Sequence, residues 1–154
     1  MSDSQATSQS PVAIVTGATA GLGKRFAQVI AAAGASVALT GRRADRLDEV
    51  AAEIRAAGGT CEPIPFDITK PEQIKEVVDK TEAALGMVDI LVNNVGIARD
   101  GYLAKMKEED WDAVIEVNLK SQFLCCRAVA PHMMEQESGR IVNITSRAWL
   151  GGPG

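Results

Sequence analysis

Histidine and aromatic side chains are scarce in this sequence of 154 residues. It has one histidine, His132, and no C-x-x-C or H-x-x-H spacing, so no metal site is expected. The three cysteines, Cys61, Cys125 and Cys126, are an odd number, and two of them are adjacent. We expect reduced thiols that pack rather than react, which is typical of a cytoplasmic protein.

Long apolar runs and an excess of positive charge are also absent. No apolar run approaches the roughly 20 residues that span a bilayer, and the net charge is −4. This balance argues against nucleic acid and against a membrane as partners, because both attract basic surfaces. The first ten residues are rich in serine and glutamine and lack the apolar core of a secretory signal. We predict a disordered tail over residues 1–11 and one domain over residues 12–154.

The most informative stretch is a glycine-rich bend directly after an apolar run, residues 12–15, and directly before a helical pattern. A strand, a tight turn and a helix N-terminus form a site for a dinucleotide pyrophosphate, because free N–H groups and the helix dipole favour phosphate there. The spacing is G-x-x-x-G-x-G. The alternative is an ordinary glycine-rich turn between a strand and a helix. The predicted pyrophosphate site comprises Gly17, Ala18, Thr19, Ala20, Gly21, Leu22 and Gly23.

Strand and helix patterns alternate along the rest of the chain with short connections. The expected strands are residues 12–15, 36–40, 61–66, 88–92 and 140–145. The expected helices are residues 21–33, 45–57, the segment that follows a capping box at Thr69–Glu72 and ends at Gly86, and residues 109–134.

This order predicts an α/β protein with a Rossmann-like, doubly wound parallel sheet. Strands that are buried on both faces need helices on both sides of the sheet. Right-handed crossovers and a phosphate turn after the first strand give the strand order 3-2-1-4-5.

The end of the second strand faces the adenosine ribose in such a fold, and here it carries Arg42 and Arg43 with no acidic residue. A carboxylate would bind the 2′-hydroxyl of NAD, whereas a guanidinium suits a 2′-phosphate. The sequence therefore favours NADP, with Arg42 the better candidate. The alternative is that both are solvated loop arginines near Asp45 and Asp48.

Several motifs occur in the order and context of one known family. They are the turn from Thr16 to Gly23, Asn93-Asn94-Val95-Gly96 after the fourth strand, Asn118 in the long helix and Ser146 after the fifth strand. The chain resembles the short-chain dehydrogenase/reductase family. Residues 96–100, with Met106, Trp111 and Asn118, are most similar to the 3-oxoacyl-(acyl-carrier-protein) reductases. Val95 departs from the family pattern, which commonly has alanine there.

The resemblance implies further cofactor contacts: Asp67 and Ile68 would meet the adenine, and Asn94 and Gly96 would lie along the adenosine ribose. Asp67 also ends the third strand at the edge where such sheets bind ligands. Asn93 is interpreted mainly as a residue whose side chain hydrogen-bonds to the backbone of its own turn.

Two residues are implied in catalysis by the resemblance. Asn118 would hold a water in a proton relay, although an amide that interrupts an apolar helical stripe can equally be a structural clamp. Ser146 would donate a hydrogen bond to the substrate carbonyl as negative charge develops there. Its alternative role is to cap a turn. His132 is expected to be a partly exposed residue near a helix end.

The family's proton donor is a tyrosine followed four positions later by a lysine, and that motif is absent from this sequence. The only tyrosine, Tyr102, has Lys105 and Lys107 at three and five residues on, so it is a poor substitute. Residues 150–154 resemble the family loop that leads to the missing motif. We expect the N-terminal part of an NADPH-dependent reductase, truncated before its last strands and inactive as isolated.

Its expected partners are an acyl thioester substrate, carried by a carrier protein or coenzyme A, and further copies of the full-length chain. The alternative is a complete, non-catalytic nucleotide-binding or partner subunit. Against it, a complete subunit is not expected to leave a sheet edge open.

Overall fold

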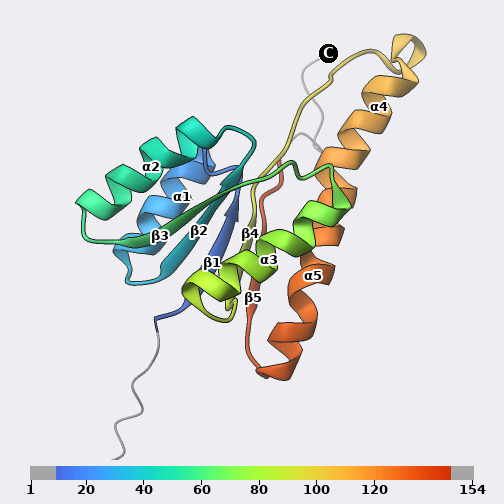
Figure 1. The fold of residues 1–154 in the computed structure, drawn as a ribbon. Helices are drawn as coiled ribbons and strands as arrows, with labels where there is room; N and C mark the ends of the chain where they lie inside the picture. The colour runs from blue at the N-terminus through green and yellow to red at the C-terminus, as the bar shows by residue number, and fades with distance from the viewer. Residues whose placement is uncertain (1–9, 147–154) are drawn as a thin grey trace, which may run out of the picture.

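The structure, a computed structural model, describes residues 10–146. The predicted loop at residues 150–154 and most of the predicted tail lie outside these residues. Strands and helices alternate along the chain (Figure 1). The strands are β1 (Val12–Thr16), β2 (Ser36–Gly41), β3 (Thr60–Pro65), β4 (Ile90–Asn93) and β5 (Arg140–Asn143). The helical segments are α1 (Gly21–Ala32), α2 (Ala44–Ala56), α3 (Pro71–Leu85), η1 (Leu103–Lys105), α4 (Glu108–Ile115), η2 (Glu116–Lys120) and α5 (Ser121–Glu135).

The five strands form one parallel sheet in the order β3-β2-β1-β4-β5, which confirms the predicted topology. The chain moves outward from β1 through β2 to β3 and then returns to place β4 on the other side of β1. The strand order therefore reverses between β1 and β4, which is where ligands bind in sheets of this kind.

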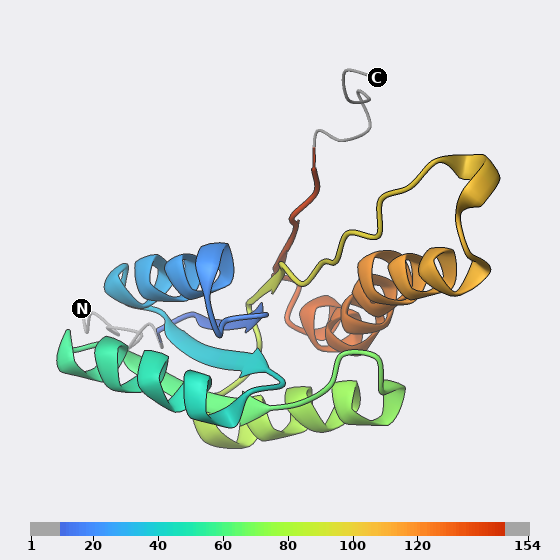
Figure 2. The same ribbon diagram turned by 90° about the horizontal axis from the view of Figure 1, so that it is seen from above.

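Alternate residues of β1, β2, β3 and β4 point to opposite faces of the sheet and build two separate cores. Val15 packs with α1 and α2 on one face, while its neighbour Ile14 packs with α3 and α5 on the other. Figure 2, seen from above, shows these helices on the two sides of the sheet. Burial on both faces explains why β1, β2 and β4 are almost continuously apolar.

The expectation that every strand is buried on both faces is wrong for β5, whose four residues are all exposed. Within the described residues β5 lies at the sheet edge and pairs with β4 alone, so it has a neighbouring strand on one side only. The apolar residues Ile141 and Val142 gave this segment the sequence pattern of a buried strand, but their side chains are exposed.

The predicted capping box before α3 is also wrong. Lys70, not Thr69, precedes the helix, and no side chain caps it. A capping box would direct the Thr69 N–H to the Glu72 carboxylate, but this N–H donates to Asp67 Oδ1 at 3.0 Å, and the Thr69 hydroxyl donates to the same oxygen at 2.8 Å. The Asp67 carboxylate thus takes both donors of Thr69. Pro71 begins the helix, a position that proline favours.

The long helix predicted over residues 109–134 contains a π-helical turn, η2, between α4 and α5, and it continues through Pro131. The predicted apolar stripe of this helix, which includes Trp111 and Leu119, does not form a buried face: Trp111 is 56% exposed and Leu119 63%. The π-helical turn also places the residues that follow it out of step with the 3.6-residue period on which the prediction rests.

Beyond the strand ladder, the side chain of Thr16 joins the carboxyl ends of β1 and β4. Its hydroxyl accepts hydrogen bonds from the backbone N–H groups of Asn94 (2.9 Å) and Val95 (3.3 Å) and donates one to the carbonyl of Val92 (3.3 Å). The Asn94 side chain returns a bond from Nδ2 to the Thr16 carbonyl at 2.9 Å. Thr16 is buried, so these groups depend on one another rather than on water.

We predict that Thr16→Val lowers the free energy of unfolding by about 2 kcal/mol, because it leaves two partly buried N–H groups unpaired. Thr40→Val is the matched control: Thr40 is equally buried, but its hydroxyl only donates to the Val15 carbonyl. That variant is expected to lose about 1 kcal/mol. Urea denaturation measures both, and equal losses would contradict the role of Thr16 as a junction.

Candidate functional site

The glycine-rich turn connects β1 to α1 at the carboxyl edge of the sheet. Gly17 and Gly21 have φ angles of 72° and 56°, a region that residues with a Cβ rarely adopt. Ala20, the residue before α1, has no polar side chain with which to cap the helix. The N–H groups of the first helical turn are therefore available to an anion.

Gly23 brings α1 close to the turn. A Cβ on this residue would collide with the carbonyl oxygen of Gly17 and would lie 2.6 Å from Asn94 Nδ2. Neither group is the end of a flexible side chain that can move away, since Asn94 Nδ2 is bonded to the Thr16 carbonyl. A glycine at this position therefore permits the close approach of α1 to the turn.

A cleft of about 640 Å³ opens beside this turn. It is bounded by the turn after β1, by the ends of β2 and β3, and by the loop after β4. The residues that line it are Gly17, Thr19, Gly41, Arg42, Arg43, Phe66, Asp67, Ile68, Thr69, Val95, Gly96, Ile97, Arg99 and Val117. Six of the predicted site residues are among them: Gly17, Thr19, Arg42, Asp67, Ile68 and Gly96.

The other predicted residues lie near this edge without lining the cleft. Ala18 is fully buried, whereas Leu22 is exposed on the first turn of α1. Asn94 is held by Thr16, as described above. Ser146 is exposed and follows β5, whose end is tied to β4 by a hydrogen bond from the Ile144 N–H to the Asn93 carbonyl at 2.9 Å. The remaining residues outside the lining are Ala20, Gly21, Gly23 and Asn118.

Two arginines follow β2, and they differ in their contacts. Arg43 Nη2 donates a hydrogen bond to Thr19 Oγ1 at 3.0 Å and so links the end of β2 to the glycine-rich turn. Arg42 and Asp67 both line the cleft, and they are close enough for the charge of Arg42 to act on the Asp67 carboxyl. The Thr69 N–H donates a hydrogen bond to Asp67, and together with the Thr69 hydroxyl and the charge of Arg42 it lowers the pKa of that carboxyl. Asp67 is therefore an ionised acceptor at neutral pH.

Asn118 lies in η2 and holds the loop after β4. Its Oδ1 accepts a hydrogen bond from the Ile97 N–H, and its Nδ2 donates one to the Ile97 carbonyl, both at 2.8 Å. The side chain is half-buried and both ends of its amide are used. This arrangement is a clamp on the loop, and π-helical turns are frequent where a helix meets a functional site.

Sequence reasoning did not include several cleft residues: Phe66, Thr69, Ile97, Arg99 and Val117. Phe66 and Thr69 could have been found, because they flank Asp67 at the end of β3, next to the end of β2. The other three belong to the loop after β4 and to η2, whose path over the cleft has no local sequence signal.

Residues outside the cleft have structural contacts. Asn93 is buried, and its Nδ2 donates to Asn143 Oδ1 at 2.9 Å. His132 is partly exposed, as predicted, and its Nδ1 lies 3.0 Å from Glu82 Oε1. Burial raises the pKa of the Cys125 thiol to about 12, consistent with a packing residue.

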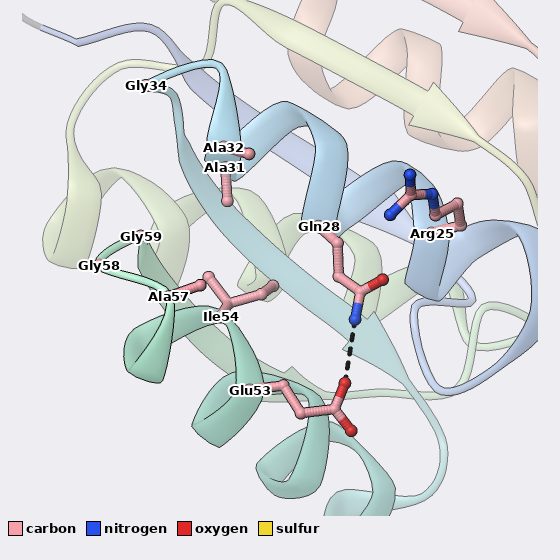
Figure 3. Close-up of a pocket in the computed structure, with 10 residues that line it drawn as sticks. All are labelled: Arg25, Gln28, Ala31, Ala32, Gly34, Glu53, Ile54, Ala57, Gly58 and Gly59. Atoms are coloured by element: carbon pink, nitrogen blue, oxygen red, sulfur yellow. Dashed lines mark hydrogen bonds between the residues drawn. The ribbon is translucent and has the colours of Figure 1, made fainter.

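A second hollow, of about 470 Å³, lies between the C-terminal halves of α1 and α2 (Figure 3). Glycine and alanine form most of its wall, and Gln28 Nε2 donates to Glu53 Oε2 at 2.9 Å across it. Nothing in its wall resembles a phosphate turn. In residues 10–146, no three metal-ligating side chains cluster and no helix is long and apolar enough to cross a membrane.

Comparison with known proteins identifies the family to which the chain belongs. The sequence pattern described as short chain dehydrogenase matches residues 11–152, nearly the whole chain. The chain belongs to the short-chain dehydrogenase family. The resemblance expected from the glycine turn, the Asn-Asn-x-Gly segment, Asn118 and Ser146 is therefore confirmed at the level of the family.

Relatives of this short-chain dehydrogenase chain include two bacterial proteins of similar identity. The (2S)-[(R)-hydroxy(phenyl)methyl]succinyl-CoA dehydrogenase subunit BbsD of Thauera aromatica is 44% identical over 146 residues, which are 95% of this chain and 59% of that protein. The 3-oxoacyl-[acyl-carrier-protein] reductase FabG of Thermotoga maritima is 43% identical over 144 residues, 93% of this chain and 58% of that protein. The chain thus spans about three fifths of the length of these relatives.

Among solved structures, the chain is similar to a metagenomic short-chain oxidoreductase in complex with NADP. The TM-score is 0.84 at 42% sequence identity, over 88% of this chain and 62% of the other. The parallel sheet and its flanking helices are thus shared with a dinucleotide-binding relative.

Gly23→Ala is expected to lower the free energy of unfolding by about 1–3 kcal/mol, because the added Cβ meets backbone that cannot move aside. Gly101→Ala is the control, since a Cβ at Gly101 meets nothing within 4 Å. Thermal and urea unfolding compare the two. If Gly23→Ala proved as mild as Gly101→Ala, the close approach of α1 to the turn would be refuted.

Proposed function

We propose that the full-length protein containing this chain is an NADPH-dependent reductase of 3-oxoacyl thioesters and that residues 12–146 provide its cofactor site. The observation that carries the proposal is the glycine turn beside a cleft whose β2 end presents Arg42 and Arg43 and no carboxylate. The names of relatives that act on acyl-[acyl-carrier-protein] or acyl-CoA substrates support the acyl thioester class, with either carrier.

The residues present fit a dinucleotide. The N–H groups at Gly17–Gly23 would hold the pyrophosphate in a turn that a Cβ on Gly23 would fill. Arg42 would pair with the 2′-phosphate. Asp67 and Ile68 would meet the adenine, and Asn94 and Gly96 would lie along the adenosine ribose. When bound, NADPH would supply the hydride for the carbon of the 3-oxo group, and a separate acid would supply the proton that completes the 3-hydroxy group.

Ser146 and Asn118 have different proposed roles in that reaction. Ser146 would donate its hydroxyl hydrogen bond to the substrate carbonyl and stabilise the negative charge that develops on oxygen. Asn118 would act as a positioning residue, because its two bonds to Ile97 fix the loop over the cofactor site. In the family, the residue at this position holds a water. Because both ends of the Asn118 side-chain amide are bonded to Ile97, such a water would bind the backbone of Asn118.

The exposed surface of α4, η2 and α5 supports the proposal that the full-length protein is a homo-oligomer. Trp111, Leu119 and Phe123 are large apolar side chains that are each more than half exposed. Exposed apolar surface of this kind favours association, and a second copy of the chain is the partner we propose. The three cysteines are unpaired, which supports a reducing compartment such as the cytoplasm.

Arg42→Asp is predicted to weaken NADPH binding about tenfold or more, because it removes a charge-assisted contact to the 2′-phosphate and adds repulsion. NADH binding should change much less, since an aspartate can accept a hydrogen bond from the 2′-hydroxyl. Calorimetric titration with both cofactors measures this.

Arg46→Asp provides the control, because this substitution makes the same change of charge on α2. Arg46 forms an ion pair with Glu49 and lies outside the cleft lining. Equal losses of affinity for NADPH and NADH in Arg42→Asp would refute the 2′-phosphate assignment.

We predict that the 154-residue polypeptide binds NADPH without reducing an acetoacetyl thioester. Tyr102 is 85% exposed just before η1, and no lysine follows it at four residues. It therefore lacks the spacing that, in the family, pairs the tyrosine proton donor with a lysine. Consumption of NADPH in a spectroscopic assay would overturn this prediction, and its loss in Tyr102→Phe would identify Tyr102 as the donor.

A further inference from the structure

Arg99 is a cleft residue that none of the roles above uses. It lies on the loop between β4 and η1 and lines the same cleft as Arg42 and Arg43. In the sheet, β4 and β2 lie on opposite sides of β1. The loop after β4 therefore approaches the glycine-rich turn from the side opposite to the two arginines of β2.

The charges of the cleft are unusual for this chain. Its charged lining residues are the three arginines, Arg42, Arg43 and Arg99, and a single carboxylate, Asp67. The chain as a whole has a net charge of −4. Positive charge is thus gathered at one hollow of an otherwise acidic molecule, which favours a ligand with several negative groups.

The loop that carries Arg99 is held firmly at one point and loosely at another. Two residues before Arg99, the Ile97 backbone is fixed by the two 2.8 Å hydrogen bonds of Asn118. Among the described residues, the side chain of Arg99 has a distant ion pair, with its Nε 3.9 Å from Asp110 Oδ1 and the two side chains 58% and 42% exposed. An exposed ion pair of this length is weak, so a stronger anion in the cleft can displace it.

We propose that Arg99 is a third phosphate-binding cation of the dinucleotide site and that Asp110 holds it aside in the free protein. The inference rests on the proposed binding of a dinucleotide. On binding, the guanidinium leaves Asp110 and pairs with a phosphate from the β4 side of the cleft. Asn118 limits this movement to the residues that follow Ile97.

The test compares the dissociation constants of NADPH and NADH for the unsubstituted chain and three variants. Arg99→Gln should weaken binding about five- to tenfold, because it removes a charge-assisted contact that is partly screened by solvent. Arg99→Lys keeps the charge and should retain most of the affinity. Asp110→Asn frees Arg99 and should tighten binding about twofold.

Glu109→Gln is the matched control for Asp110→Asn. It removes the same charge from the same first turn of α4, but the ion pair of Arg99 is with Asp110. It should leave both dissociation constants unchanged. Thermal unfolding of each variant shows whether the fold is intact, and the dependence of affinity on salt should be weaker in Arg99→Gln.

The results separate the two proposals. Equal loss for NADPH and NADH in Arg99→Gln assigns the contact to the pyrophosphate, and loss for NADPH alone assigns it to the 2′-phosphate. Normal affinity of Arg99→Gln for both cofactors overturns the role of Arg99 and leaves the cofactor site standing. If the unsubstituted chain binds neither cofactor, the proposed function and this inference both fall.

Discussion

The hydroxyl of Thr16 is the interaction on which the arrangement of the site depends. It pairs with three backbone groups of the segment from Val92 to Val95, at the place where the strand order reverses. The Asn94 side chain closes the same junction from the other direction and also limits the space beside Gly23. Two segments almost eighty residues apart in sequence are thereby joined at the point where both leave the sheet.

Parallel topology explains why distant residues meet in one cleft. Every strand of the sheet ends at the same edge, so the turns after β1, β2, β3 and β4 gather there. The connections from β1 and β4 lead into helices on opposite faces of the sheet, which leaves a crevice between them. The cleft therefore follows from the order of the strands and does not require a separate substrate domain.

The fold was predictable from sequence because its determinants are local and repeated. Three features of the sequence indicate the same parallel sheet: apolar strands, glycines at helix ends and the alternation of strands with helices. A fold is predicted reliably when such independent signals agree. Thr69 shows where this reasoning fails. Its spacing to Glu72 satisfies a capping rule, but the Thr69 N–H donates to the Asp67 carboxylate and not to that of Glu72. A rule based on spacing cannot choose between two carboxylates whose positions depend on the tertiary structure.

The site was predictable only in part, for a related reason. The glycine turn, Arg42 and Asp67 stand at strand ends that the sequence pattern defines. Arg99 belongs to a loop that is held by Asn118. The side-chain amide of Asn118 makes two hydrogen bonds to Ile97, and Asn118 itself lies in the π-helical turn. That turn alters the helical period, although its sequence contains no glycine or proline from which the change could be predicted.

The π-helical turn also makes the number of residues in this helix significant. Because a π-helical turn holds one residue more than an α-helical turn, deleting one residue from η2 would let it close to ordinary helical geometry with α5 in nearly its present orientation. Deleting one residue from α5 before Leu124 would instead rotate Leu124 and Val129, now in the core, by about 100° around the helix axis. The chain after α5 leads directly into β5 and Ser146. A change in the length of this helix outside η2 would therefore be transmitted along the axis to the strand that precedes Ser146.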